Sequence, residues 1–262
     1  MFSVRVLASG SSGNATYVRA GRLALLFDAG IPRRPLVELM QAAGIPPRLD
    51  AIFLSHEHVD HLRGVRGMHQ LTNAPVYLSP GTLDAAPELT DVDSQLLEGG
   101  VELDNALITP LAVPHDAAEP LNFVVRHKEH SLGIFTDLGH ANAAVKDAFS
   151  QLDCAVLEAN HSIDMLWKGP YPLELKQRIS SPLGHLSNEE AAALLMECSS
   201  PTLAAVFIAH RSEHNNTRDR SFATLDHARR ALQKKGHSDF ALLHTERREP
   251  TKEVEVGHGA HR

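Results

Sequence analysis

The sequence predicts an α/β fold in which two β-sheets lie inside and helices cover them outside. Short apolar runs alternate with tight polar turns through the first half of the chain, and longer helical patterns separate the later runs. Hydrophobic residues make up 43% of the 262 residues, which is enough for a sizeable core. A mixture of strands and helices of this kind packs as layers around a common interior.

Individual elements follow from the periodicity of apolar residues and from turn and cap signals. The expected strands are Val4–Leu7, Thr16–Val18, Leu23–Phe27, Ala51–Leu54, Val76–Ser79, Leu107–Val113, Asn122–Arg126, Ser131–Phe135, Cys154–Leu157 and Leu203–Ile208. The expected helices are Arg34–Ala43, Leu62–Leu71, Ala141–Gln151, Asn188–Cys198 and Arg218–Lys235. Ser187 followed by Glu190 predicts a capping box, which places His185 in the loop before a helix.

We expect one domain over residues 1–248, because a chain of this length can bury a single core. Residues 249–262 lose apolar periodicity, which predicts a flexible tail with His258 and His261 in solvent. No segment approaches about 18 consecutive apolar residues, and the N-terminus lacks the pattern of a signal peptide. We therefore expect a cytoplasmic protein with no membrane contact, whose oligomeric state the sequence leaves open.

The charge balance limits the partners. The chain has 25 Lys and Arg against 32 Asp and Glu, a net charge of −7, so any contact with nucleic acid must be local. Cys154 and Cys198 lack CxxC spacing, which indicates small core residues and no cysteine-rich zinc site. The 17 histidines stand out, and their positions decide whether they bind metal.

The strongest motif is SHEHVDH at Ser55–His61, which follows the apolar run AIFL. A regular helix would point His56 and His58 to different faces, whereas a turn after a strand lets both bind one metal ion while Asp60 and His61 reach a second. Imidazole and carboxylate ligands suit zinc, manganese or iron. The alternative is a solvated polar loop, which rarely has such a sequence at the end of a buried strand.

Two metal ions need more ligands than this loop offers, and three further candidates follow apolar runs. His115 ends LITPLAVPH, Asp137 ends SLGIFTD and His210 ends LAAVFIAH. A single histidine at the end of a strand is more often a packed or surface residue. Three such residues after three strands converge on a shared metal site.

These motifs resemble those of the metallo-β-lactamase superfamily of αββα hydrolases. LFDAG, which contains Asp28, matches the first motif and SHEHVDH the second, while His115, Asp137 and His210 match the others. Within the superfamily the chain is similar to the YycJ (WalJ) group and its phosphodiesterase relatives PhnP and ribonuclease Z. Matching strings include ASGSSGNATYV, PHDAAEPLNF and GPYPLELKQRISSPLGHLSNEEA. The resemblance, from about Ser3 to Leu243, implies a four-layer αββα sandwich.

The resemblance also implies two divalent metal ions and assigns their ligands. His56, His58 and His115 would hold the first ion, Asp60, His61 and His210 the second, and Asp137 would bridge both. This set leaves open positions for water and substrate, as catalytic metal sites require. Asp28 would orient a histidine or the ligand loop, although it also suits a turn before Gly30.

With two metal ions, a metal-bound hydroxide is the expected nucleophile, and Asp60 is expected to hold or receive its proton. By resemblance to the matching loop of ribonuclease Z, His185 is the expected proton donor to the leaving oxygen, although it could simply pack over Leu186. Glu158 is a further catalytic candidate, and Glu158 and His161 could both orient His185 or line the cleft.

The resemblance to the YycJ group implies a metal-dependent phosphodiesterase, and the expected activity is that of a nuclease of the 5′-to-3′ exonuclease type acting on DNA. Arg211 and Asn215 follow His210 and are candidates for contacting the substrate, while a solvated surface is the alternative. A cyclic phosphodiesterase like PhnP, or hydrolysis of a thioester or lactone at the same metal ions, are the competing functions.

Overall fold

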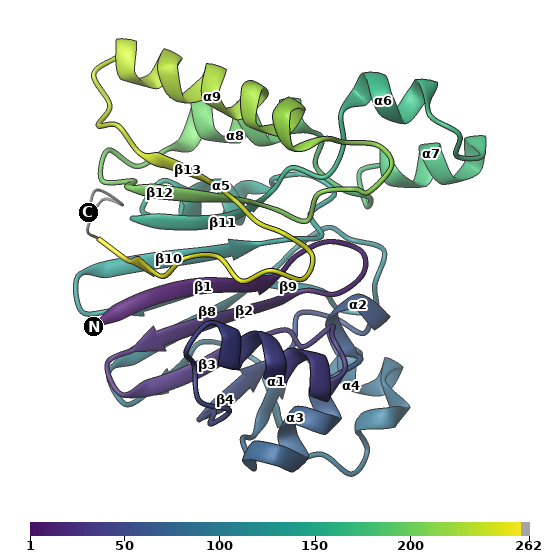
Figure 1. Ribbon diagram of the computed structural model, residues 1–262, viewed down its shortest axis with the longest axis vertical. Helices are drawn as coiled ribbons and strands as arrows, with labels where there is room; N and C mark the ends of the chain where they lie inside the picture. Colours follow the sequence, from purple (N-terminus) through teal and green to yellow (C-terminus); the bar gives the residue numbers. More distant parts are fainter. Residues whose placement is uncertain (258–262) are drawn as a thin grey trace. The chain divides into compact units, whose positions relative to one another are not determined.

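The computed structural model describes residues 1–257 (Figure 1). The chain forms two compact units. Unit 1 contains residues 1–112, 117–129 and 245–255. Unit 2 contains residues 113–116 and 130–244 and the described residues from Val256 onward. The single domain over residues 1–248 that the sequence predicts stays a prediction.

Unit 1 is built around a mixed sheet with the strand order β14-β1-β2-β3-β4-β5-β6, and its remaining strands pair as β7-β8-β9. Its strands are β1 Phe2–Ala8, β2 Ala15–Ala20, β3 Leu23–Phe27, β4 Ala51–Phe53, β5 Val76–Leu78, β6 Ser94–Leu96, β7 Val101–Leu103, β8 Ala106–Ala112, β9 Leu121–His127 and β14 Val254–Glu255. Its helices are α1 Arg33–Ala42, α2 Val59–Leu62, α3 Val65–Thr72, α4 Pro80–Ala85 and the 3₁₀ helix η1 Pro87–Leu89.

The change from antiparallel to parallel pairing in this sheet sets the position of the predicted first and second motifs. β1, β2 and β3 pair antiparallel, whereas β3 and β4 pair parallel with Leu25 opposite Ala51. The carboxyl ends of β3 and β4 therefore meet at one edge of the sheet. Asp28 follows β3 there, and the SHEHVDH segment follows β4.

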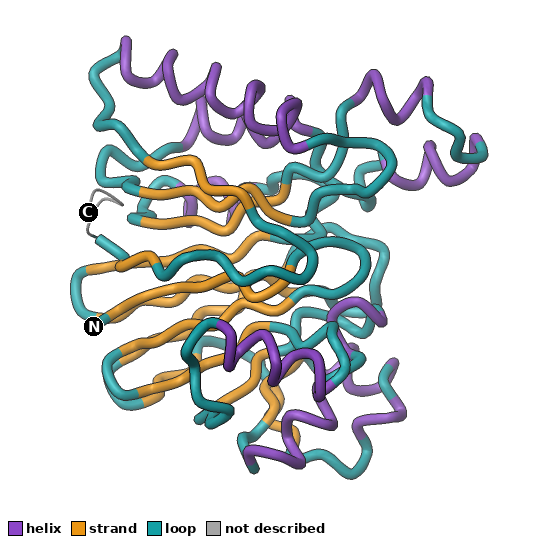
Figure 2. Tube along the Cα trace, in the orientation of Figure 1, coloured by secondary structure: helices purple, strands orange, loops and turns teal. Residues whose placement is uncertain are grey.

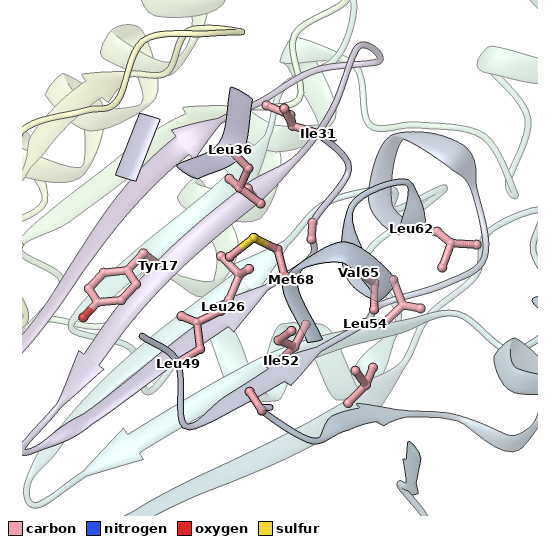
Figure 3. Packing of buried hydrophobic residues seen from close by; sticks show 14 of the residues in the cluster. Tyr17, Leu26, Ile31, Leu36, Leu49, Ile52, Leu54, Leu62, Val65 and Met68 are labelled. Carbon is pink, nitrogen blue, oxygen red and sulfur yellow. The ribbon is translucent and has the colours of Figure 1, made fainter. Parts of the chain in front are cut away.

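Helices α1 and α3 cover one face of this sheet with their apolar sides (Figures 1 and 3). Leu36 and Met68 are fully buried against Leu26 and Ile52 of the strands. Burial of a side chain of this size contributes about 1.5–3 kcal/mol, so these helices are stabilised mainly by the face they bury.

Aromatic rings fill the space between the sheet and β9. Phe53 stacks on Phe27 with centroids 5.0 Å apart and on Tyr77 at 4.9 Å, and it meets Phe123 of β9 edge-on at 5.7 Å. Phe27, Phe53 and Phe123 are all buried. Within unit 1 a layer of helices, a sheet and the β7-β8-β9 strands therefore pack in that order, as the predicted sandwich requires.

Two parts of unit 1 differ from the sequence prediction. The predicted helix Leu62–Leu71 is divided into α2 and α3 at Gly64, where any side chain would clash with the Ile31 carbonyl oxygen. Val254 and Glu255, predicted to lie in a tail, pair antiparallel with β1, and the Ser3 hydroxyl donates to Glu253 at 2.6 Å. The rest of the predicted tail, with His258 and His261, lies outside the described residues.

Unit 2 alternates strands with helices (Figure 2). Its elements are β10 His130–Phe135, α5 Ala143–Phe149, β11 Cys154–Glu158, α6 Ile163–Lys168, α7 Leu173–Ile179, α8 Asn188–Cys198, β12 Ala205–Ala209, α9 Arg218–Lys234 and β13 Ala241–His244. The strands pair parallel in the order β10-β11-β12-β13, and every residue of β11 and β12 is buried. Parallel strands that are covered on both faces have continuous apolar sequences, so these strands were recognisable in the sequence.

The carboxyl ends of β10, β11 and β12 meet at one edge of this sheet. Asp137 follows β10, Glu158 ends β11 and His210 follows β12. The predicted capping box is confirmed, since Ser187 Oγ accepts from the Glu190 N–H and the Glu190 carboxylate accepts from the Ser187 N–H. Across residues 1–257, no helix combines the length and apolarity that crossing a bilayer requires.

We predict that Phe53→Ala destabilises the protein by about 3–5 kcal/mol, because it removes the ring around which three other aromatic rings pack. Leu107→Ala, at a strand position that is 40% exposed, is the matched control and should cost under about 0.5 kcal/mol. Urea denaturation followed by circular dichroism measures both. A similar loss in the two variants would contradict the role given to Phe53.

Candidate metal centre

In unit 1 a buried carboxylate lies behind the predicted ligand loop. Asp28 accepts a hydrogen bond from the Ser55 N–H at 2.8 Å and another from the Ser55 hydroxyl at 3.0 Å. The same carboxylate lies 2.7 Å from Nδ1 of His61. Since Asp28 is 5% exposed and an ionised carboxylate can only accept, the proton of this bond is on His61 Nδ1.

The same reasoning fixes the tautomer of His56. The Ser55 hydroxyl donates its single proton to the Asp28 carboxylate. In its contact with His56 at 2.9 Å the hydroxyl oxygen is therefore the acceptor, and His56 Nδ1–H is the donor. Both rings therefore carry their proton on Nδ1 and their lone pair on Nε2. That is the state in which a histidine binds metal through Nε2.

Asn14 gives independent support for the state of His61. Its side-chain amide lies 3.0 Å from His61 Nε2, and its carbonyl oxygen accepts from the Gly10 N–H at 2.9 Å. With its oxygen so engaged, Asn14 donates through Nδ2, and His61 Nε2 accepts. The same amide donates to the Asp60 carbonyl at 3.3 Å, so Asn14 fastens the Gly10–Asn14 turn to the ligand loop.

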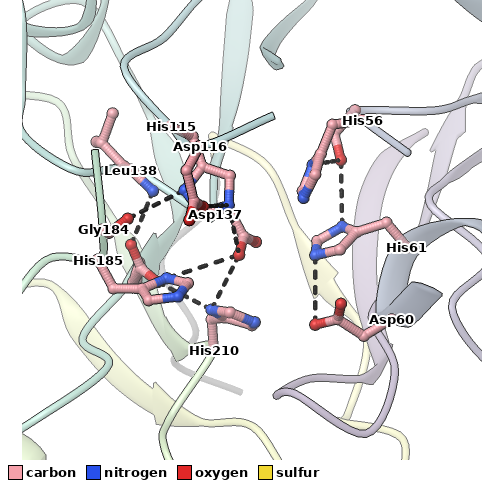
Figure 4. Close-up of polar contacts among 12 residues, drawn as sticks. His56, Asp60, His61, His115, Asp116, Asp137, Leu138, Gly184, His185 and His210 are labelled. Carbon is pink, nitrogen blue, oxygen red and sulfur yellow. Dashed lines mark hydrogen bonds and ion pairs between the residues drawn. The ribbon is translucent and has the colours of Figure 1, made fainter. Parts of the chain in front are cut away.

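The other two ligands of the loop, His58 and Asp60, lie close to these histidines, and Figure 4 shows Asp60 beside His61. The rings of His56 and His58 are 4.5 Å apart between centroids, and those of His56 and His61 are 4.2 Å apart. The Asp60 carboxylate is 3.7 Å from His61 Nε2, and its side chain is 22% exposed. Unit 1 thus brings together the four predicted ligands of SHEHVDH.

In unit 2 the three strand ends bring together a second group. Asp137, Glu158, His185 and His210 each offer a ligand atom within 4.8 Å of the others. His185 comes from the loop before α8, and the other three come from the edge of the sheet. The sequence predicted each of these residues for the site, with Glu158 as a residue that could orient His185, but did not predict that Glu158 also contacts His210.

Glu158 holds this group together. One of its carboxylate oxygens accepts from Nδ1 of His185 at 2.9 Å and from Nδ1 of His210 at 2.8 Å. Its other oxygen accepts from the backbone N–H of Leu138 at 2.9 Å and of Leu186 at 3.1 Å. With four donors and no exposed surface, Glu158 positions the two histidines, and both rings turn Nε2 away from it.

The electrostatics of the group follow from these contacts. Burial alone would raise the pKa of Glu158, but the charges and hydrogen bonds of His185 and His210 lower it to about 2. Burial alone would lower the pKa of His185, but Glu158 raises it above its ordinary value. The ionised Glu158 carboxylate and the protonated form of His185 therefore stabilise each other.

His115 reaches the same group from residues 113–116 (Figure 4). Its Nδ1–H donates to the Gly184 carbonyl at 3.0 Å, which leaves the lone pair on Nε2. That nitrogen lies 3.7 Å from an Asp137 oxygen and 3.4 Å from an Asp116 oxygen. Burial lowers the pKa of His115, so the ring is neutral near pH 7, as a metal ligand must be.

Three of the predicted residues occupy a backbone conformation that side chains rarely adopt. Asp28, Asp137 and His210 have φ values of 59°, 56° and 50°. Asp28 and His210 directly follow the strands β3 and β12, and Asp137 lies two positions after the end of β10. Such strain costs about 1–3 kcal/mol per residue and persists where the surroundings fix it, as they do at functional sites.

The other predicted site residues lie at the margins of the group in unit 2. His161 is 2% exposed, and its backbone carbonyl accepts from the Asn188 N–H. Asn215 is fully buried, and its backbone N–H donates to the Ser212 hydroxyl at 3.2 Å, so its contacts order the loop after His210. Arg211 is half-buried. Substrate contact by Arg211 or Asn215 stays a prediction.

The donor set fits divalent metal ions. Four buried histidines have an acceptor on Nδ1 and their lone pair on Nε2, and two carboxylates accompany them. Hard-to-intermediate metals such as zinc and manganese take such ligands, and a held Nδ1 proton is the usual arrangement behind a metal-bound histidine. Sequence reasoning missed Ser55 and Asn14, whose roles depend on contacts between separate segments.

Comparison with known proteins identifies the same superfamily that the sequence motifs resemble. Residues 24–208 match the family described as the Beta-lactamase superfamily domain. The chain is 30% identical over 257 residues to exodeoxyribonuclease YycJ of Bacillus anthracis, covering 94% of this chain and 96% of that protein. It is 32% identical over 233 residues to exodeoxyribonuclease WalJ of Streptococcus pneumoniae serotype 2, covering 86% and 87%.

A solved structure has the same fold at low sequence identity. The metallo-beta-lactamase fold protein YhfI of Bacillus subtilis superimposes with a TM-score of 0.70 and 16% identity, covering 96% of this chain and 100% of that one. At this identity the likeness concerns the fold.

We predict that Asp28→Asn lowers metal affinity about 10- to 100-fold, because the amide no longer holds the His61 Nδ1 proton as a carboxylate does. Asn tolerates the left-handed backbone, so the fold should persist. Asp104→Asn is the matched control, since Asp104 also has a positive φ of 52° and pairs only at the surface with Arg22. Competition with a fluorescent chelator measures affinity, and equal values for both variants would contradict the role of Asp28.

A second prediction concerns pH. Burial lowers the pKa of His161 to about 4. As the pH falls below about 6.5 the unfolded chain takes up this proton first, so His161 lowers the free energy of unfolding by about 1.4 kcal/mol per pH unit until the folded pKa is reached. In metal-free buffer His161→Gln should remove this slope between pH 6 and pH 5, measured by urea denaturation, whereas His227→Gln at an exposed position should keep it. An unchanged slope in His161→Gln would refute the assignment.

Proposed function

Because this chain belongs to the metallo-β-lactamase superfamily and is a metal-dependent hydrolase, we propose that it is a nuclease that removes nucleotides from the 5′ end of DNA. Two relatives named exodeoxyribonuclease, matched over 94% and 86% of the chain, support DNA as the substrate class. The observation that carries the proposal is the set of buried histidines whose Nδ1 protons are held by Asp28, Ser55, Gly184 and Glu158.

We further propose that the chain binds two divalent metal ions through the ligands that the sequence predicts. The proposed ligands are His56, His58 and His115 for the first ion, Asp60, His61 and His210 for the second, and Asp137 for both. When bound, such ions polarise a phosphoryl oxygen and lower the pKa of a nearby water toward neutrality. Zinc, manganese and iron all accept this ligand set.

The protein's own groups then have distinct tasks. The partly exposed Asp60 carboxylate holds the proton of the attacking water, since a carboxylate is the natural acceptor at that position. His185, held by Glu158 through Nδ1, presents Nε2 as the proton donor to the leaving oxygen. Glu158 is buried beneath both histidines, so its contribution is to position them.

The test is a substrate panel with purified protein reconstituted with Mn²⁺ or Zn²⁺. Single- and double-stranded DNA labelled at either end, RNA, a cyclic phosphodiester, bis-p-nitrophenyl phosphate and a lactone form the panel, with Asp60→Ala as the inactive control. We expect mononucleotides to be released from the 5′ end of DNA and the activity to be lost with EDTA. Turnover of the lactone alone, or of the cyclic phosphodiester alone, would overturn the proposal.

We predict that His185→Ala lowers kcat on DNA about 10²- to 10⁴-fold, because loss of the proton donor leaves an alkoxide to be expelled unaided. The defect should be much smaller on bis-p-nitrophenyl phosphate, whose nitrophenolate leaves without a proton. Exposed His227→Ala is the control and should behave as wild type. Equal defects of His185→Ala on both substrates would show that His185 does not act on the leaving group.

A further inference from the structure

Unit 1 contains a cavity of about 470 Å³ beside the ligand loop. It is lined by Ser12, Ile31, Pro32, Pro35, Glu38, Leu39, Arg63 and Arg248. Ile31, Leu39 and the two prolines form an apolar wall along the start of α1. Its volume lies within the range of about 300–1,000 Å³ that is typical of small-ligand pockets.

The cavity shares its walls with the elements that carry the predicted ligands. Arg63 lies two residues after His61, at the end of α2. Ser12 belongs to the Gly10–Asn14 turn, which Asn14 fastens to Asp60 and His61. Ile31 is packed between this turn and α2, since a side chain at Gly13 would clash with it and one at Gly64 would clash with its carbonyl oxygen. A molecule in the cavity would therefore adjoin the ligand loop of unit 1.

The two arginines make the mouth of the cavity positive. Arg63 and Arg248 are exposed, and neither guanidinium has a hydrogen bond or ion pair within residues 1–257. The acidic residue of the lining, Glu38, pairs with Arg34 at 3.1 Å. In a chain with a net charge of −7, two unneutralised arginines beside an apolar wall form a local site for an anion with a flat apolar part.

We propose that this cavity binds one nucleotide of the DNA strand beside the phosphate that is cut. The base packs on the wall of Ile31, Leu39 and Pro35, and Arg63 and Arg248 contact the phosphates on either side of it. Arginine joins phosphates through paired N–H donors and also stacks on bases, so both parts of a nucleotide find a partner. This inference rests on the proposed function and names the part of the protein that grips the strand.

The first test measures binding without hydrolysis. The affinity of a fluorescent single-stranded oligonucleotide is followed by anisotropy in EDTA for wild type, Arg63→Ala/Arg248→Ala and Arg22→Ala/Arg66→Ala. The control removes the same charge from two exposed arginines that are ion-paired with Asp104 and Asp91. We expect the cavity variant to bind at least about 10-fold more weakly and the control to bind as wild type. For the cavity variant, the slope of log K against log salt concentration should also become shallower by about 0.7 for each phosphate contact that is lost.

The second test separates this inference from the proposed function. Leu39→Trp, whose ring would occupy the cavity, should raise KM for DNA, with thermal unfolding confirming the fold. If Arg63→Ala/Arg248→Ala binds DNA as the control does, the cavity inference is overturned and the proposed function stands. If binding depends on the two arginines but no phosphodiester is hydrolysed with metal present, the proposed function fails and the cavity inference stands.

Discussion

A buried carboxylate that holds histidine Nδ1 protons is the interaction on which the candidate metal centre depends. In unit 1, Asp28 accepts two hydrogen bonds from Ser55 and one from His61. Because the Ser55 hydroxyl donates to Asp28, it accepts from His56, which fixes the His56 proton on Nδ1. Withdrawing an ionised carboxylate from water costs several kcal/mol, and these bonds offset that cost. They also decide which nitrogen each ring presents. The parallel pairing of β3 and β4 makes the contact possible, because it brings both strand ends to one edge.

Glu158 repeats this arrangement in unit 2 with one difference. Asp28 serves two predicted ligands, whereas Glu158 holds a predicted ligand, His210, and the proposed proton donor, His185, on a single oxygen. Any movement of this carboxylate would displace both rings together. Two backbone N–H groups fix its other oxygen, so the segment after β10 and the loop before α8 set its position. The sequence motifs place Glu158 at the site, and its hydrogen bonds to His185 and His210 explain why it acts through other residues.

Much of the fold was predictable because its signals are local. Every predicted strand and helix has a counterpart in the structure, and the αββα fold class and the hydrolase class are confirmed. The elements that the sequence did not predict are short and depend on their surroundings. β14 has two residues and exists because the edge of β1 offers it hydrogen-bond partners. The break at Gly64 has the same origin, since Ile31, distant in sequence, approaches too closely for a side chain.

The strained residues show where local preference and site geometry conflict. Asp tolerates the left-handed conformation of Asp28 and Asp137, but His210 gains nothing from it locally and loses about 1–2 kcal/mol. The strand before it is buried throughout, and Glu158 fixes its ring, so the surroundings impose the conformation. A positive φ directly after the strand turns the chain sharply while the side chain stays at the edge of the sheet. The strain at His210 is therefore a consequence of ending a buried parallel strand on a side chain that must meet Glu158, and a glycine, which would relieve it, would remove the ligand.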